Sequence, residues 1–253
     1  MQNSNMHGKP ARVPRFFTSA SLRAGGATQL PEEAAHHAVH VLRLRAGDAL
    51  TLFDGRGGEY AGRIAAIERL RVTVDVLAHR ALERESPLAV TLVQGVSAGE
   101  KMDFTVQKAT ELGVAALQPV LAERSTGRVA GERAAQKRAH WQRVAIAACE
   151  QCGRNRVPEV LAPLKLEEYC RARAPGTALL LSPEARLALR EAAAGLQGAA
   201  TLAAGPESGF TATEEALLAH CGFVPVRLGP RVLRTETAAL AALAALNALA
   251  GDF

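Results

Sequence analysis

The sequence has few aromatic residues, few cysteines and no long apolar run. Aromatic residues make up 4% of the 253 positions, and the four cysteines are too few for a disulfide scaffold in a chain of this length. No apolar run approaches the roughly 20 residues that a membrane-spanning helix needs. Residues 1–13 are polar and lack the apolar centre of a secretory signal. We therefore expect a cytoplasmic protein with no membrane association.

The chain has enough apolar side chains to fold. Hydrophobic residues make up 48% of it, whereas charged residues make up 22% and are mixed in sign, which excludes a disordered chain. A length of 253 residues predicts one large or two modest domains.

Positive charge is concentrated in two regions. The net charge is +5, and residues 1–80 hold 11 basic against 7 acidic residues. Residues 124–156 hold eight basic residues against two acidic ones. An anionic partner such as RNA is one interpretation, and a solvated arginine-rich surface is the other.

Residues 14–82 are predicted to form a small, mostly β domain. Strand candidates span 48–53, 59–67 and 71–78, and the last alternates Val72, Val74 and Val76. A glycine-rich turn at 54–58 joins the first two strands. Residues 31–42 are a helix candidate that begins with proline.

Residues 87–253, which follow a linker at 81–87, are predicted to form an α/β domain with a parallel sheet flanked by helices. The expected strands are 88–93, 115–121, 177–181, 199–203 and 223–228, and the expected helices are 101–112, 132–149, 184–194, 213–220 and 237–250. Strands that alternate with helices are typical of parallel sheets.

Glycine and polar residues follow two of these strands directly, at 203–210 and 228–237, and more weakly a third at 94–96. In open α/β sheets, ligands bind beyond the carboxyl ends of the strands. A strand-to-helix turn needs glycine and proline in any case, but two charged turns of this kind favour a binding site.

Several motifs together resemble one enzyme family. The most specific are Gly205-Pro206-Glu207 and the segment 228–238, which reads Leu-Gly-Pro-Arg-Val-Leu-Arg-Thr-Glu-Thr-Ala. Segments 40–48, 101–113, 123–125 and 150–159 agree, so the similarity extends over nearly the whole chain from Pro14. The sequence resembles the SPOUT class of RNA methyltransferases, and within it the bacterial family that methylates N3 of a uridine in 16S ribosomal RNA.

This resemblance implies a fold, a cofactor and partners. It implies an N-terminal PUA-like β-barrel and a C-terminal SPOUT domain whose chain forms a deep trefoil knot. It also implies S-adenosylmethionine as the cofactor, a homodimer through the knot domain, and a specific uridine of 16S rRNA as the target within the 30S subunit. A SPOUT enzyme for another nucleotide, or a non-catalytic ribosome-assembly protein that binds RNA, are the alternatives.

The resemblance and the chemistry of the reaction also suggest residues. Arg234 is the foremost candidate for stabilising the uridine anion, with Arg231 beside it, because a cation favours the charge that develops when N3 loses its proton. Glu207 and Glu236 are candidates for orientation or proton acceptance. The cofactor-binding candidates are Leu181, Ala203, Gly205, Pro206, Gly209, Leu228, Gly229 and Leu233. The RNA-binding candidates are Arg15, Arg23, Arg43, Arg45, Arg124, Arg128, Arg154 and Arg156.

One departure from the family pattern stands out. The family has Gly-Pro-Glu-Gly-Gly, and Ser208 replaces the fourth residue here, at a modest cost if that residue has a positive φ.

Metal or redox roles are disfavoured, because Cys149 and Cys152 lack a second pair and His36 and His40 lack a third ligand.

Overall fold

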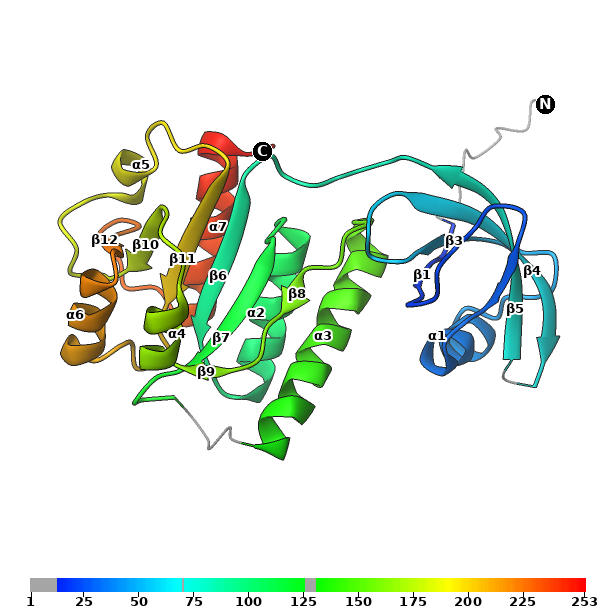
Figure 1. Ribbon diagram of the computed structural model, residues 1–253, viewed down its shortest axis with the longest axis horizontal. Coiled ribbons are helices and arrows are strands. Elements are labelled where there is room, and N and C mark those ends of the chain that lie inside the picture. The colour runs from blue at the N-terminus through cyan, green and yellow to red at the C-terminus, as the bar shows by residue number, and fades with distance from the viewer. Residues whose placement is uncertain (1–12, 70, 126–130) are drawn as a thin grey trace, which may run out of the picture. The chain divides into compact units, whose positions relative to one another are not determined.

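The computed structural model describes residues 13–69, 71–125 and 131–253 (Figure 1). The chain divides into two compact units. The first runs to Arg84 and also includes Gly153–Arg156, and the second comprises Glu85–Cys152 and Val157–Phe253. The predicted domains 14–82 and 87–253 did not include this excursion of residues 153–156 into the first unit.

The first unit is built on a five-stranded sheet with the order β1-β3-β4-β5-β2. Its strands are β1 (Arg15–Phe17), β2 (Ala27–Gln29), β3 (Ala49–Phe53), β4 (Glu59–Glu68) and β5 (Arg71–Arg80). β1 and β3 run parallel, and the other neighbours are antiparallel. Val72, Val74 and Val76 of β5 are buried, as their alternation predicts.

One helical segment packs on this sheet. It begins as α1 (Glu32–His36) and continues as the π-helix η1 (His37–Val41), so the helix predicted at 31–42 is present with a wider final turn. Ala35 and Ala38 are buried against the core of the sheet.

The second unit contains a parallel sheet with the order β12-β10-β11-β6-β7-β8, and β9 also pairs with β7. The strands are β6 (Ala89–Gly95), β7 (Ala116–Leu121), β8 (Glu159–Val160), β9 (Leu164–Lys165), β10 (Ala178–Leu181), β11 (Ala199–Ala204) and β12 (Val224–Val226). All their pairings are parallel, as the continuous apolar runs predict.

Helices cover both faces of this sheet (Figure 1). They are α2 (Gly99–Glu111), α3 (Glu132–Cys152), α4 (Leu166–Ala172), α5 (Leu189–Ala192), α6 (Ala212–His220) and α7 (Thr235–Ala250). In β10, Leu179 packs in the core with α2, α3, α5 and α7, whereas Leu180 packs in the core with α4 and α6. Side chains of a strand alternate between faces, and both faces are apolar here because both are covered.

The helix predicted at 184–194 is wrong over most of its length, since only α5 is helical. The preceding backbone bonds instead to the chain after β12, where the N–H of Arg227 donates to the carbonyl of Leu187. The sequence pattern also missed α4, and it missed the short strands β1, β2, β8 and β9.

Candidate functional site

A cavity of about 590 Å³ lies at the carboxyl edge of the parallel sheet. Its wall comes from the loops that follow β10, β11 and β12, and from the first turn of α7. These strands are adjacent and parallel, so their carboxyl ends meet at one edge. Segments that are far apart in the sequence therefore form one site.

Most of the predicted cofactor-binding residues line this cavity. The lining includes Leu181, Gly205, Pro206, Gly209, Leu228, Gly229 and Leu233. Ala203 does not reach it: its side chain is fully buried in the core beneath α4 and α6, and the wall begins at Ala204.

Glycine occurs at three positions of the wall for different structural reasons. Gly229 and Gly209 have φ angles of +130° and +70°, and a Cβ atom on either would meet open space. A Cβ atom added to Gly205 would instead lie 2.8 Å from the backbone nitrogen of Phe210. Only glycine therefore fits at this position of the loop. Ser208 does not have a positive φ; the neighbouring Gly209 does. The backbone strain expected at Ser208 is therefore absent.

Glu207 lines the cavity, and its carboxylate is engaged. Its Oε1 accepts a hydrogen bond from the N–H of Ala98 at 2.9 Å and lies 3.5 Å from the Nζ of Lys101. Burial alone would raise the pKa of Glu207, but the Ala98 hydrogen bond and the Lys101 charge outweigh it and lower the pKa. The carboxylate therefore stays ionised and holds the amino end of α2.

The structure separates the other candidate catalytic residues. Arg231 is exposed and lines the cavity. Arg234 is also exposed, but it is the N-cap of α7 and does not belong to the cavity wall, and neither does Glu236 in the first turn of α7.

Several residues of the cavity wall were not among the candidates from the sequence. Ser182 and Glu184 directly follow β10, so the strand-end rule could have found them, whereas Glu215 comes from α6 and carries no such signal. Burial raises the pKa of Glu215, and the negative charge of Glu184 adds to this effect against a hydrogen bond with Ser182. Arg124, predicted to bind RNA, also lines the cavity, and its Nη1 donates to the carbonyl of Ser208 at 3.1 Å.

Arg23, Arg43 and Arg45, three of the RNA-binding candidates in the first unit, are exposed. Arg43 has a φ of +55°, a left-handed conformation that is unfavourable for a residue with a Cβ atom. It follows η1, where the N–H of Leu44 donates to the carbonyl of Ala38 and so fixes the turn around Arg43. Arg128 lies outside the described residues.

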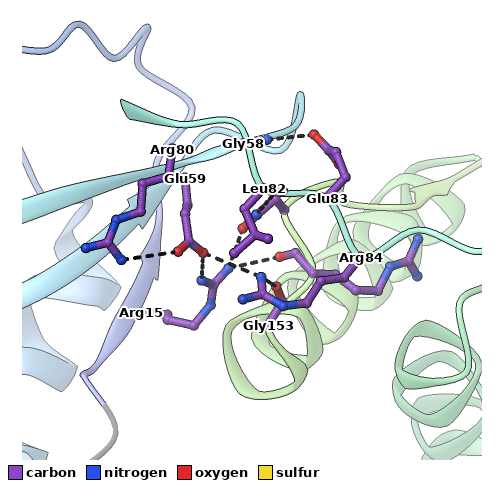
Figure 2. Close-up of polar contacts among 10 residues, drawn as sticks. Arg15, Gly58, Glu59, Arg80, Leu82, Glu83, Arg84 and Gly153 are labelled. Carbon is purple, nitrogen blue, oxygen red and sulfur yellow. Dashed lines mark hydrogen bonds and ion pairs between the residues drawn. The ribbon is translucent and has the colours of Figure 1, made fainter. Parts of the chain in front are cut away.

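Unlike these three arginines, Arg15 has a side chain that is only 7% exposed, and Arg154 is 4% exposed. Figure 2 shows the Arg15 guanidinium between Glu59 and the 153–156 segment, with Nη1 2.6 Å from Glu59 Oε2. Its Nη2 donates to Asn155 Oδ1 at 2.6 Å. Arg156 is exposed but lies 3.3 Å from Glu83. As surface contacts for RNA, Arg15 and Arg154 are therefore poor candidates.

The described residues contain no cluster of three or more His, Cys, Asp or Glu side chains suited to a metal ion. In the same part of the chain, no helix is long and apolar enough to cross a membrane.

Comparison with known proteins agrees with this architecture. Residues 84–247 match the family model of the RNA methyltransferase domain, and residues 30–77 match that of the RNA methyltransferase PUA domain. The chain thus has the two domains of an RNA methyltransferase with a PUA domain.

Individual relatives narrow the class. The ribosomal RNA small subunit methyltransferase E of Buchnera aphidicola (from Schizaphis graminum) is 33% identical over 95% of this chain and 98% of that protein. Its namesake from Bacillus subtilis is 31% identical over 93% and 96%. The Neisseria gonorrhoeae protein of that name, solved bound to S-adenosylmethionine, is 41% identical with a TM-score of 0.87, over 96% and 100% of the chains. The chain belongs to the ribosomal RNA small subunit methyltransferase E family.

Proposed function

We propose that this protein transfers a methyl group from S-adenosylmethionine to N3 of a specific uridine in 16S rRNA. The observation that carries the proposal is the cavity itself, whose wall is formed by three strand-end loops with open space beside Gly209 and Gly229. Two relatives, from Neisseria gonorrhoeae and Legionella pneumophila, were solved with S-adenosylmethionine bound, at 41% and 37% identity.

The residues of the wall suit this cofactor. Gly205, Leu228 and Leu233 contribute to the wall of the cavity, and main-chain hydrogen bonds from such segments suit an adenine. Glu184 and Glu215 place acidic groups beside a ligand that is cationic at sulfur. When bound, S-adenosylmethionine supplies an electrophilic methyl group.

The chain must also make N3 of uridine nucleophilic. Removal of the N3 proton leaves a negative charge that spreads over O2 and O4, and a fixed cation lowers the energy of that anion. Arg231 is the arginine of the 228–237 segment that lines the cavity, so we assign it this role. Glu207, which holds the amino end of α2 and Lys101, serves in orientation.

The RNA itself would be bound by exposed arginines. Arg23, Arg43 and Arg45 of the PUA-like unit and Arg124 at the cavity can reach phosphates, since their side chains are exposed. The family resemblance adds the 30S subunit as the form of the substrate, a homodimer through a knotted second unit, and a cytoplasmic location as parts of this proposal.

Replacing Gly229 with valine tests the cofactor site. The new side chain would enter the cavity and would also be strained at a φ of +130°. Isothermal calorimetry should show that Gly229→Val weakens S-adenosylmethionine binding at least about tenfold, or roughly 1.4 kcal/mol.

Gly198→Val is the matched control, because Gly198 also has a positive φ (+73°) and open space but does not line the cavity. It should bind the cofactor normally. Unchanged affinity in a folded Gly229→Val protein would exclude the cavity as the cofactor site.

A further inference from the structure

Gln94 lies at the carboxyl end of β6, behind the wall of the cavity, and is 1% exposed. Its Nε2 donates to the carbonyl of Gly205 at 3.1 Å and to the Thr235 hydroxyl at 3.0 Å. The Thr235 hydroxyl in turn donates to the same Gly205 carbonyl. One carboxamide therefore joins the loop after β11 to the first residue of α7.

The backbone passes very close at this point. A Cβ atom added to Gly95 would lie 2.5 Å from both the nitrogen and the Cδ of Pro206. The Gly205–Pro206 peptide thus rests directly on the end of β6, and the neighbouring Gln94 side chain bonds to it from within the core. These contacts fix the position of the 205–210 loop, which forms part of the cavity wall, relative to the end of β6.

The chemistry of the contact requires a donor. The oxygens of Gly205, Thr235 and Gly95 all lie within 3.1 Å of the Gln94 Nε2, so an acceptor in that position would be repelled. The Oε1 of Gln94 is buried and has no hydrogen-bond partner among the described residues. A buried acceptor without a partner is unfavourable, so the amide is best explained by what its NH₂ group holds.

We propose that Gln94 is a positioning residue for the cofactor site. It keeps the Gly205 loop and the amino end of α7, which both contribute to the wall, in the relative position that the ligand needs. Gln94 does not itself line the cavity, so it acts through Gly205 and Thr235. The inference rests on the proposed function, since it assumes that the cavity binds S-adenosylmethionine.

Gln94→Met provides the test, because it keeps the length and burial of the side chain while removing both the donor and the unpartnered acceptor. The carbonyls of Gly205 and Gly95 each keep another donor in this variant, the hydroxyls of Thr235 and Ser97, so neither is left unpaired and we expect little loss of stability. We expect the dissociation constant for S-adenosylmethionine to rise at least about tenfold, with a melting temperature close to that of the unmodified protein.

Gln118→Met is the matched control. Gln118 lies on the neighbouring strand β7, is 4% exposed, and donates from Nε2 to the carbonyls of Pro119 and Ala162 at 2.8 and 2.9 Å, away from the cavity. A purely structural role of Gln94 would make the two variants alike. The inference predicts that only Gln94→Met loses cofactor affinity.

Thr235 gives a second, independent measurement, which decides the matter if Gln94→Met does not fold. Thr235→Ser keeps the hydroxyl and should bind the cofactor normally, whereas Thr235→Val should weaken binding as Gln94→Met does. The double variant should be no weaker than either single one, because both break the same chain of hydrogen bonds.

The outcomes separate the two proposals. If the unmodified protein does not bind S-adenosylmethionine, the proposed function fails. If it binds, and Gln94→Met or Thr235→Val binds equally well, the positioning role of Gln94 is wrong.

Discussion

Arg231 and Arg234 belong to one turn between β12 and α7, yet only Arg231 lines the cavity. Arg234 was the foremost candidate because a cation in this segment favours the uridine anion, but the sequence does not show which of the two arginines lines the cavity. The difference has a kinetic consequence. A group that stabilises charge in the transition state acts on turnover, and a group that grips a phosphate acts on RNA affinity.

Single-turnover rates at saturating RNA and cofactor distinguish these roles. We expect Arg231→Ala to lose about two orders of magnitude in rate, as for the loss of one oxyanion donor. Arg234→Ala should weaken RNA binding but recover most of its rate at saturation. The reverse pattern would return the catalytic role to Arg234.

Residue types at strand ends were the most informative part of the sequence. Gly209 and Gly229 line the cavity as predicted because parallel strands must end at one edge. The predicted role of Arg15 was misleading, since a sequence does not show that Glu59 and Asn155 will enclose an arginine. Glu215 was missed because it lies within α6 and not directly after a strand, so its position carries no strand-end signal.

At the scale of elements, the turn after η1 links backbone strain to RNA binding. Arg43 has a left-handed φ of +55°, which glycine adopts without strain. Arg43→Gly should therefore leave the free energy of unfolding within about 1 kcal/mol, because relief of strain offsets the greater freedom of the unfolded chain. RNA binding should weaken, and its salt dependence should fall by about one unit of slope.

Arg69→Gly is the control for this variant, since Arg69 has a φ of +58° at the end of β4. It should have the same effect on the backbone but leave RNA affinity unchanged in filter-binding titrations. Equal losses of RNA affinity in both variants would contradict a specific contact at Arg43.

The buried ion pair of the PUA-like unit predicts an acid-sensitive element. Burial alone would raise the pKa of Glu59, but the hydrogen bond and charge of Arg15 and the charge of Arg84 outweigh burial and hold the pKa below its ordinary value (Figure 2). The resulting stabilisation is full above the ordinary carboxyl pKa, roughly 4, and is lost as pH falls through the lowered value. Glu59→Gln should cost about 3 kcal/mol at pH 7, since it leaves Arg15 buried without its counter-charge.

Calorimetry at pH 7 and in acid checks this prediction. The destabilisation by Glu59→Gln should shrink as the pH is lowered, because the unmodified protein then loses the same interaction. Glu68→Gln, at the exposed end of the same strand, should change little at either pH. If the difference in the free energy of unfolding between Glu59→Gln and the unmodified protein were the same at both pH values, the Glu59–Arg15 ion pair would not be the source of acid sensitivity.

The periodic patterns predicted the long elements well and the short ones poorly. β4, β5, α2, α3 and α7 are long enough to be recognised from their apolar residues, and all were anticipated within a few residues. The two-residue strands β8 and β9 are too short to carry a pattern and exist only because β7 is beside them. Residues 184–188 have a helical composition, but their backbone bonds to Arg227 instead, which is a tertiary effect.

For the whole molecule, the central proposal is the identity of the methylated atom, N3 of a uridine in 16S rRNA. The direct measurement incubates the purified protein and S-adenosylmethionine with 30S subunits from a strain that lacks this methyltransferase, and then maps the product by nucleoside mass spectrometry. We expect one new 3-methyluridine in 16S rRNA, and we expect no 3-methyluridine when the Gly229→Val protein is used. Methylation at another atom or base, or no methylation by protein that binds the cofactor, would contradict this proposal.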